Sequence, residues 1–446
     1  MVLASRKRTD LQEGLRRARQ LLGREVGIVK RGAEAEGGTD DFGVFNYVCE
    51  MNNYPHFLEG ENRNGSTALF AEKAKMGAFG ECVERYCCSS YDENDFIFES
   101  YERVKDYAVN VEDFVLYSES QYEREDFSAP RFPAEKKINW VEGYSLTEKR
   151  EVLVPACFVY TPYRLTKTKE PLFLKETITT GAACGSSLEE AVIGGIYEVI
   201  ERDAFAITWL NQLPLPRLDF ASIRNESTIT LVEKMKNSSL FLFANYITLD
   251  IKVPTFCAAL MDTSGKLPIL QLGCSSSLDP EKALLSSITE LFQWRSGAKL
   301  QMKYYPGYTH KGDDFRDIDT MIKHGLLYGL TDMRDTFSFL VKAPFIKIND
   351  IPDKSSADVL EEINTCMKMF NREGMNVVVV DITTPDISEV GFFVVKVVIS
   401  HMQPITGDYN YRRLGGRRLY EMPQKLAFSD KVVEEADLNR YPFPLI

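Results

Sequence analysis

The spacing of apolar and polar positions along the chain predicts three long helices. Apolar residues recur every three or four positions over Thr67–Cys88, over Leu188–Leu210 and over about Pro280–Leu300. The second segment, LEEAVIGGIYEVIERDAFAITWL, is apolar on most of its faces. Because a helix of that kind buries most of its surface, we expect it to lie largely inside the protein.

Runs of β-branched and aromatic residues predict strands around these helices. The run VLVPACFVY is expected to be a strand, and VPTFCAALM and PILQLGC are expected to be two more. Farther along, a helix near residues 355–372 precedes the strands NVVVVDI and GFFVVKVVIS, and this order predicts a βαβ-like unit. Helices packed on β-sheet place the chain in the α+β class.

The remaining segments have weaker patterns. Residues 1–40 begin with the basic helical pattern LQEGLRRARQLL and continue into a Gly-rich stretch, which predicts an N-terminal arm or small cap. Residues 41–70 are polar and interrupted by Gly and Asn, which is typical of loops. Residues 310–350 contain only short acidic and aromatic pieces.

Composition is that of a globular protein without a membrane span. Of the 446 residues, 44% are hydrophobic and 26% are charged, which argues against extensive disorder. No apolar run approaches ~18 residues. The N-terminus, MVLASRKRTD, is not followed by the apolar segment of a secretory signal, so we expect a cytoplasmic protein.

Charge and cysteine usage narrow the function further. A net charge of −12 argues against nonspecific binding of nucleic acid, which requires a basic surface. The nine cysteines are scattered and form no Cys-x-x-Cys pair, which is typical of reduced thiols. The four histidines are not clustered with them, so no zinc site is predicted.

Each of the three long helices carries acidic or amide side chains at short spacing. The first contains ExxER at Glu81, Glu84 and Arg85. Since an α-helix turns about 100° per residue, its two glutamates lie roughly 60° apart on one face. The same geometry puts residues 190 and 201 of the second helix within about 20° of each other. The second helix repeats ExxER at Glu198, Glu201 and Arg202 and carries Glu190 nearer its start. The third helix has Glu290 and Gln293, three residues apart.

Carboxylates on buried helices repel one another unless they share cations. Magnesium prefers hard oxygen ligands and is usually held by carboxylates together with phosphates. Three such helices facing one cavity would therefore make a magnesium–nucleotide site. The two arginines would hold the carboxylates or the phosphate oxygens.

Simpler interpretations remain open at this point. ExxER on a surface helix commonly serves only helix propensity and pairing between neighbouring turns. Ser187-x-x-Glu190 also fits a capping box. The lead-in TTGAACGSS could bring backbone N–H groups to an anion or form an ordinary tight turn. The chain contains no GxxxxGK[ST] and no GxGxxG that opens a helix, which rules out a P-loop.

Several of these segments resemble the YcaO family. GAFGECVERYCC resembles its first motif, TTGAACGSSLEEAVIGGIYEVIERDA closely resembles the second, and KALLSSITELFQWR resembles the third. RRLGGRRLYEMP and the ending DLNRYPFPLI resemble the C-terminal region of YcaO enzymes that act on peptides. The resemblance begins near residue 65 and divides the chain into an N-terminal arm or cap at 1–64, a candidate partner contact, and a YcaO domain at 65–446.

The resemblance implies a YcaO fold, an α+β fold with an ATP and magnesium site between acid-bearing helices. It implies an ATP-dependent cyclodehydratase that phosphorylates backbone amides and turns Cys, Ser or Thr of a ribosomal precursor peptide into thiazoline or oxazoline. The Mg2+ ligands it implies are Glu81, Glu84, Glu190, Glu198, Glu201 and Glu290. The residues it assigns to ATP are Arg85, Ser186 and Arg202, with Glu81 and Glu198.

The chain also departs from the family pattern. Azoline-forming members often end in a PxPxP-like sequence that reaches the active site, and Pro442 and Pro444 match it as tentative catalytic-tail residues. Leu445 and Ile446 follow them, so the terminal carboxylate would be displaced; the alternative is a frayed tail. Ser286 stands where the family commonly has a basic residue. The stretch Arg63-Asn64-Gly65 is the nearest match to the usual Gly-Lys loop.

The resemblance also implies partners. Many cyclodehydratases work with an E1-like or ocin-ThiF-like protein that binds the leader peptide, and we expect a separate protein of that kind here. A flavin dehydrogenase is a further candidate partner, and a homodimer or hetero-oligomer is expected. Two alternatives to azoline formation stay open: thioamide or amidine formation by the same chemistry, and a non-catalytic scaffold subunit.

Overall fold

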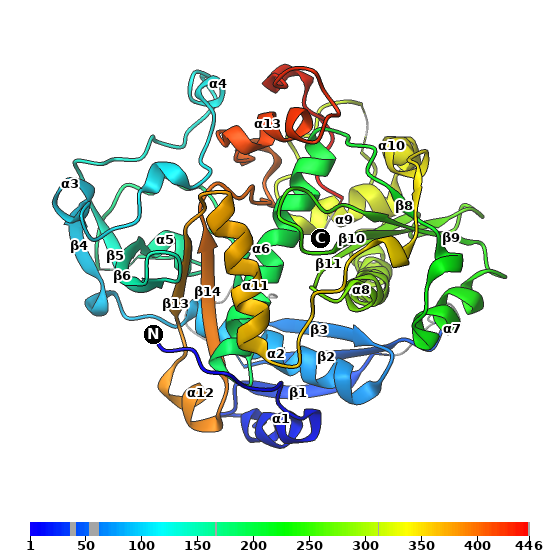
Figure 1. Cartoon of the computed structure of the whole chain (residues 1–446), viewed down its shortest axis with the longest axis horizontal. Coiled ribbons are helices and arrows are strands. Elements are labelled where there is room, and N and C mark those ends of the chain that lie inside the picture. Colours follow the sequence, from blue (N-terminus) through cyan, green and yellow to red (C-terminus); the bar gives the residue numbers. More distant parts are fainter. Residues whose placement is uncertain (36–41, 53–61, 166, 311, 445–446) are drawn as a thin grey trace.

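Helices and three β-sheets make up the structure, a computed structural model that describes residues 1–35, 42–52, 62–165, 167–310 and 312–444 (Figure 1). This mixture confirms the predicted α+β class. The three long helices are present as periodicity predicts: α2 (Ala71–Ser89), α6 (Leu188–Leu210) and α8 (Pro280–Tyr304). The predicted start of the first at Thr67 is wrong, because Thr67 and Ala68 pair with the neighbouring strand as part of β3 (Arg63–Ala68). No helix in the described ranges has the length and apolar content needed to cross a bilayer.

The first sheet packs against α2 and contains three antiparallel strands, β1 (Val29–Glu34), β2 (Phe45–Met51) and β3 (Arg63–Ala68). The predicted loop over 41–70 is therefore wrong for β2 and β3. The sequence RNGSTA of β3 has little intrinsic β propensity. Pairing with β2 and burial of Asn64 and Ala68 stabilise it nevertheless. The predicted division between residues 64 and 65 falls within β3.

The second sheet has the strand order β4 (Ile97–Ser100), β5 (Lys137–Ser145), β13 (Val377–Asp381), β14 (Phe393–Ile399) and β7 (Ala182–Gly185). β6 (Arg150–Pro155) pairs with β5, and the predicted strand VLVPACFVY turns into α5 (Ala156–Val159) after Pro155. The βαβ-like unit is also wrong, because β13 and β14 are antiparallel. α11 (Val359–Arg372) precedes both, and only the short α12 (Pro385–Val390) joins them, whereas a parallel return needs a longer crossover.

The third sheet has the order β11 (Leu270–Ser276), β10 (Thr255–Asp262), β9 (Leu240–Tyr246), β8 (Arg217–Leu218) and β12 (Phe345–Ile346). Every residue of β10 is buried, and α8 packs on β10 and β11. α9 (Met321–Leu330) packs on α8 in turn, so the region predicted to hold only short pieces contains a full helix.

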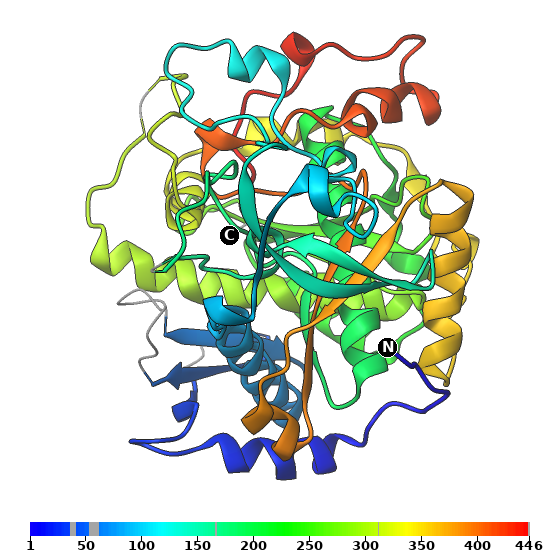
Figure 2. The same ribbon diagram turned by 90° about the vertical axis from the view of Figure 1, so that its left-hand side faces the viewer.

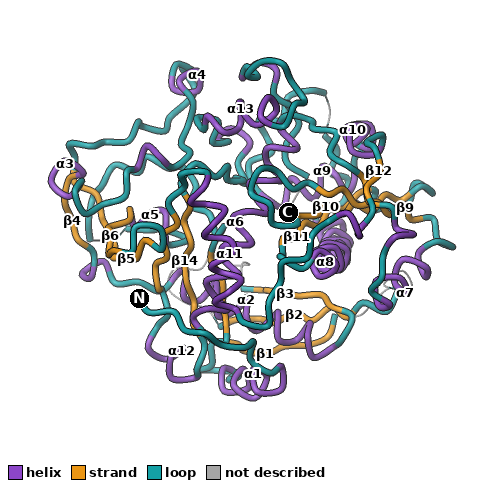
Figure 3. Tube along the Cα trace, viewed as in Figure 1, coloured by secondary structure: helices purple, strands orange, loops and turns teal. Residues whose placement is uncertain are grey.

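α6 lies between the second and third sheets and contacts both (Figure 3). Apolar side chains cover most of its circumference, as its sequence predicts. In Figure 2 the blue N-terminal segment crosses the lower edge of the molecule. The remaining α-helices in the described ranges are α1 (Leu11–Ala18), α3 (Tyr101–Val104), α4 (Glu119–Tyr122), α7 (Glu226–Met235), α10 (Ser338–Val341) and α13 (Arg417–Lys425).

Candidate active site

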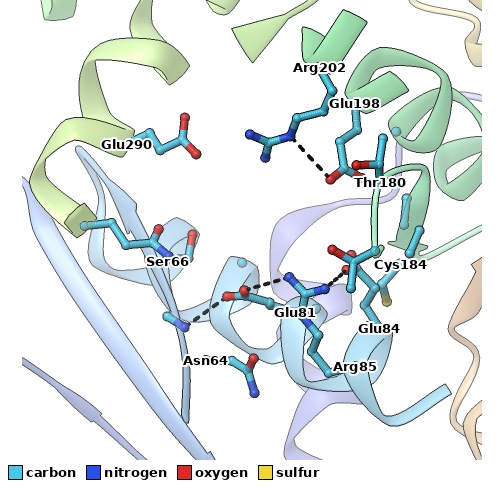
Figure 4. A pocket seen from close by; sticks show the side chains of 18 of the residues that line it. Asn64, Ser66, Glu81, Glu84, Arg85, Thr180, Cys184, Glu198, Arg202 and Glu290 are labelled. Atoms are coloured by element: carbon cyan, nitrogen blue, oxygen red, sulfur yellow. Dashed lines mark hydrogen bonds and ion pairs between the residues drawn. The ribbon is translucent and has the colours of Figure 1, made fainter. Parts of the chain in front are cut away.

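A cavity of about 1580 Å3 opens where α2, α6 and α8 approach β3 and β7. Its volume exceeds the ~1,000 Å3 that a drug-sized ligand occupies, so it has room for more than one such ligand. Figure 4 shows the carboxylates of Glu81, Glu84, Glu198 and Glu290 around one space. The predicted site residues that line the cavity are Glu81, Glu84, Arg85, Ser186, Glu190, Glu198, Arg202 and Glu290.

Four of these carboxylates accept a hydrogen bond from a backbone N–H of another segment. Gly65 in β3 donates to Glu81 at 3.0 Å, and Gly181 before β7 donates to Glu198 at 3.0 Å. Cys274 in β11 donates to Glu290 at 2.8 Å. Thr9 donates to Glu190 at 2.5 Å. Because each donor belongs to the main chain, the surrounding fold fixes these carboxylates in place.

Glu190 is held differently from what a capping box requires. Ser187 caps α6 by accepting the Glu190 N–H at 3.2 Å. The Glu190 carboxylate accepts the N–H of Thr9 in the N-terminal segment. The capping interpretation is thus right for the Ser187 hydroxyl, while the Glu190 side chain is directed to a different partner.

Each ExxER arginine lies between the two glutamates of its own motif. The Arg85 guanidinium is 3.5 Å from the carboxylates of both Glu81 and Glu84. These separations are longer than the ~2.8 Å of a tight charge-assisted hydrogen bond. The guanidinium therefore keeps hydrogen-bonding capacity for a further anion.

The second motif repeats this arrangement. The Arg202 guanidinium is 3.9 Å from Glu198 and 3.6 Å from Glu201. Glu201 is 12% exposed and, unlike Glu198, does not line the cavity. Its contact with the site is therefore the ion pair with Arg202, which does line the cavity.

Burial raises the pKa of several of these carboxyls, because a charged carboxylate loses its hydration there. The pKa of Glu84 rises to about 8, with Glu198 and Glu81 adding repulsion and Arg85 opposing it. The pKa values of Glu81 and Glu290 are also raised by burial, and that of Glu201 lies well above its ordinary range. Burial thus favours the neutral form of these carboxyls, and their full ionisation would leave more negative charge than the two arginines compensate.

A lysine that sequence analysis missed contributes to this balance. Lys396 in β14 is buried, and its ammonium donates to the carbonyl of Ile178 at 2.6 Å. Burial lowers its pKa to about 8, while the nearby Glu198 and Glu84 carboxylates favour the charged form. A single lysine in the otherwise apolar run GFFVVKVVIS was the signal that could have revealed it.

The donor set fits a hard divalent cation. Its ligating atoms are mainly carboxylate oxygens, which Mg2+ prefers. In the described ranges no group of three His, Cys, Asp or Glu side chains is arranged to hold an ion alone. Magnesium usually takes only one or two carboxylates and completes its octahedron with water and phosphate oxygens, so this spread suits an ion bound together with a nucleotide.

Lysine side chains also line the cavity, at positions that sequence analysis did not select. Ser286 lines it without a charge, but Lys282, one turn earlier on α8, lines it too, as does Lys73 on α2. Asn64 and Gly65, the nearest match to a Gly-Lys loop, are also lining residues. These lysines could not be chosen from sequence because they face the cavity only after α2 and α8 pack.

The C-terminal tail is packed rather than frayed over the residues that the structure describes, which end at Pro444. Pro442 and Pro444 are buried, and Tyr328 donates to the Pro442 carbonyl at 2.6 Å. They do not line the cavity. His324 lies between the tail and the cavity. One of its ring nitrogens contacts the Phe443 carbonyl at 2.6 Å, and the other contacts the carbonyl of Gly407, which lines the cavity, at 2.9 Å. The predicted displacement by Leu445 and Ile446 falls outside the described residues.

Comparison with known proteins gives one family. The model described as YcaO cyclodehydratase, ATP- and Mg2+-binding, matches residues 65–403. An uncharacterised protein of Methanothermobacter thermautotrophicus is 28% identical over 240 residues, which are 52% of this chain and 58% of that protein. The chain therefore spans less than two thirds of this relative.

Solved structures share the fold. A heterocyclase in complex with substrate and cofactor matches with a TM-score of 0.84 and 25% identity, over 100% of this chain and 59% of that one. The heterocyclase TruD matches with a TM-score of 0.71 and 23% identity, over 100% of this chain and 55% of that one. A YcaO protein from Methanopyrus kandleri bound with AMPPCP and Mg2+ matches with a TM-score of 0.58 and 20% identity, over 89% of this chain and 92% of that one.

Proposed function

The chain belongs to the YcaO family, which is described as binding ATP and Mg2+, and on that premise we propose that it is an ATP-dependent peptide cyclodehydratase. Its substrate would be a ribosomal precursor peptide whose Cys, Ser or Thr residues become thiazoline or oxazoline. The observation that carries the proposal is the single cavity in which three helices present carboxylates and two helices present arginines.

The proposed roles follow from position. Glu81, Glu190, Glu198 and Glu290, each fixed by a backbone N–H, would hold Mg2+ ions together with Glu84, with each ion taking one or two of these carboxylates and completing its shell with phosphate oxygens and water. Arg85 and Arg202 would bind phosphate oxygens of ATP, and Ser186, which lines the cavity just before α6, would lie near the nucleotide. Glu201, predicted as a further Mg2+ ligand, would orient the Arg202 guanidinium through its ion pair. Bound Mg2+ would neutralise the charge that develops on the phosphates.

The proposed reaction removes one water from the peptide. The thiol or hydroxyl of the substrate residue adds to the preceding carbonyl carbon, and the oxygen of the resulting hemiorthoamide takes the γ-phosphoryl group of ATP. Phosphate then leaves with the C–O electron pair, the amide nitrogen loses its proton, and a C=N bond forms within the ring that the first addition closed. The protein contributes positioning and charge stabilisation.

The cavity also has a lining that suits the peptide. This lining includes Tyr163, Leu172, Leu174, Met321 and Ile405, and residues 176–180. Apolar side chains with polar groups among them suit a bound peptide. The tail residues Pro442 and Pro444 would support this lining through His324 and Gly407.

The partners belong to the same proposal. Relatives in the fold include the E. coli microcin synthetase McbBCD complex, also solved with pro-MccB17 bound. We expect a leader-binding E1-like or ocin-ThiF-like protein to deliver the peptide here, in a homodimer or hetero-oligomer, with a flavin dehydrogenase acting afterwards. A cytoplasmic location would supply the ATP.

The test measures phosphate release and peptide mass together. Purified protein is incubated with ATP, Mg2+, a candidate precursor peptide and its leader-binding protein, comparing wild type with Glu198→Gln. Glu72→Gln, an exposed acid in the first turn of α2, is the matched control. We expect one water lost per ring in wild type and control, and no loss in Glu198→Gln.

Other outcomes decide between the alternatives. Replacement of oxygen by sulfur in the peptide would overturn cyclodehydration in favour of thioamide formation. Absence of both ATP binding and turnover in every mixture would overturn the enzyme and leave a scaffold subunit.

A further inference from the structure

The N-terminal segment before α1 crosses the start of α6 and is tied down on both sides. Its Ala4 N–H donates to Glu189 at 2.7 Å, and Arg6 pairs with the same carboxylate at 3.1 Å. Arg8 forms an ion pair with Glu362 of α11. Residues 4–9, here called the N-terminal strap, thus lie between the first turn of α6 and the start of α11 and contact both.

Backbone contacts hold the strap in an extended form. Lys7 forms an antiparallel β-bridge with Asp358, and Val359 donates its N–H to the Arg6 carbonyl at 3.0 Å. The Arg6 N–H donates to the Asp358 carboxylate at 3.1 Å. Because a β-bridge fixes the direction of the neighbouring peptide groups, the Thr9 N–H has a defined aim.

The Thr9 N–H donates a hydrogen bond to the Glu190 carboxylate at 2.5 Å. Glu190 lines the cavity, as does Leu11 just beyond the strap. The chain after the strap is fixed as well, since Arg17 donates to the carbonyls of Ser186 and Gly391 at 3.2 and 2.8 Å.

We propose that the N-terminal strap is a positioning element of the active site, which aims the Glu190 carboxylate at Mg2+ through the Thr9 peptide N–H. This inference rests on the proposed function for the identity of the ligand. Three other carboxylates of the site also accept a backbone N–H, donated by Gly65, Gly181 and Cys274. Those donors lie in a strand or next to one. The strap donates its N–H from a segment outside every sheet, so the geometry at Glu190 depends on whether the strap is docked.

Removing one hydrogen atom tests this proposal. Thr9→Pro deletes the N–H, whereas Thr9→Ala keeps it and deletes the side chain. Binding of the Mg2+ complex of a non-hydrolysable ATP analogue is measured by calorimetry over a range of Mg2+ concentrations. Thr9→Pro should need about tenfold more Mg2+ than Thr9→Ala, as expected for a lost hydrogen bond to a charged group. Equal Mg2+ dependence in the two variants would overturn the proposal.

A ligand-free measurement separates this proposal from the proposed function. Amide hydrogen exchange of the segment containing Thr9 is compared in wild type, Glu190→Ala and Glu198→Ala. The strap amide should exchange faster only in Glu190→Ala, because Glu198 is held by Gly181 instead. Unchanged exchange in Glu190→Ala would overturn the strap's hold on Glu190, whatever the nucleotide does. Failure of wild type to bind the Mg2+ complex would overturn the proposed function instead.

Discussion

The two ExxER motifs on α2 and α6 are built alike but supported differently. In both, a glycine N–H fixes the first glutamate at 3.0 Å, and the second forms an ion pair with the motif's arginine. Each helix packs on two sheets: α6 packs on β14 and β7 of the second sheet and on β11 of the third, whereas α2 packs on β2 and β3 of the first sheet and on β7 of the second. The second glutamate is less exposed in α6, at 12% for Glu201 against 18% for Glu84.

The two glutamates within each motif also differ in what holds them, and this indicates that they have different roles. The first glutamate is aimed by the fold, so its position is set before any ligand arrives. The second is buried without a backbone donor, and its pKa is raised. Its charge therefore depends on the arginine and on a cation. We expect the first position to be sensitive to backbone changes and the second to changes in charge.

Neutralising the second glutamate should have the largest effect. Glu84→Gln should lower ATP turnover by at least about a hundredfold, because a carboxylate that faces the cation is lost. Glu201→Gln should lower it less, since Glu201 acts through Arg202. Steady-state phosphate release checks the order, with Glu72→Gln as control. Equal losses for Glu84→Gln and Glu201→Gln would mean that both carboxylates contact the ligand.

The two glycines should differ sharply in stability when each is changed to alanine. Gly181 has φ +85°, and a Cβ there would lie 2.0 Å from the Val397 carbonyl oxygen. At Gly65 the nearest atom would be 3.4 Å away, an ordinary contact. Gly181→Ala should therefore cost about 2–3 kcal/mol or more, and Gly65→Ala less than about 1 kcal/mol. Denaturant unfolding measures both, and similar costs would refute this account of the two supports.

Replacing each arginine by lysine should have a moderate effect. Lysine keeps the charge but loses the planar fork that can serve two glutamates and a phosphate together. Arg85→Lys and Arg202→Lys should each raise the KM for ATP by about tenfold, with the smaller change in kcat. Arg16→Lys, on the exposed face of α1, is the control. An unchanged KM in both variants would place the phosphates away from the arginines.

The pH dependence should be the smallest effect. Folding raises the pKa of Glu84 from 4.5 to about 8, so between these values the folded protein holds a proton that the unfolded chain has lost. The free energy of unfolding without metal should therefore fall as pH rises through this window. Thermal unfolding in chelator from about pH 5 to about pH 8 measures the slope, which should be shallower in Glu84→Gln. An identical slope in that variant would assign the effect to other groups.

Mg2+ should reverse this trend. Binding an ion to the cluster displaces protons, so stabilisation by Mg2+ should grow as pH rises. The same unfolding series with added Mg2+ and nucleotide checks it. Stabilisation that is independent of pH would mean that the carboxyls are already ionised before the ion binds.

The acid-bearing helices could be predicted from sequence because their apolar spacing extends over many turns. α6 begins at the predicted residue, Leu188, since Ser187 caps it locally. β3 could not be predicted, because its stability comes from pairing with β2 and packing on α2 rather than from its own residues. The βαβ-like expectation failed for a similar reason, since strand direction depends on tertiary pairing.

Most charged side chains of the site could be predicted from sequence, whereas the backbone groups that hold them in place could not. Periodicity brought Glu81, Glu84 and Glu198 into consideration, and they do meet in one cavity. The backbone donors at Thr9, Gly181 and Cys274 leave no mark in residue type, because every residue except proline has an N–H. Lys396 was visible as an isolated charge, but its proximity to Glu84 depends on how β14 packs.

α6 sets the distances along the whole site. Its 23 residues span roughly 35 Å. About 29 Å of this length separates Glu190 in the first turn from Trp209, whose indole donates to the Tyr441 carbonyl of the tail at 3.1 Å. Inserting or deleting one residue would rotate everything beyond it by about 100° and shift it by about 1.5 Å. Evolution could therefore lengthen the surface loops of this protein freely, but the number of residues between Glu190 and Trp209 should stay constant among relatives that keep the same activity.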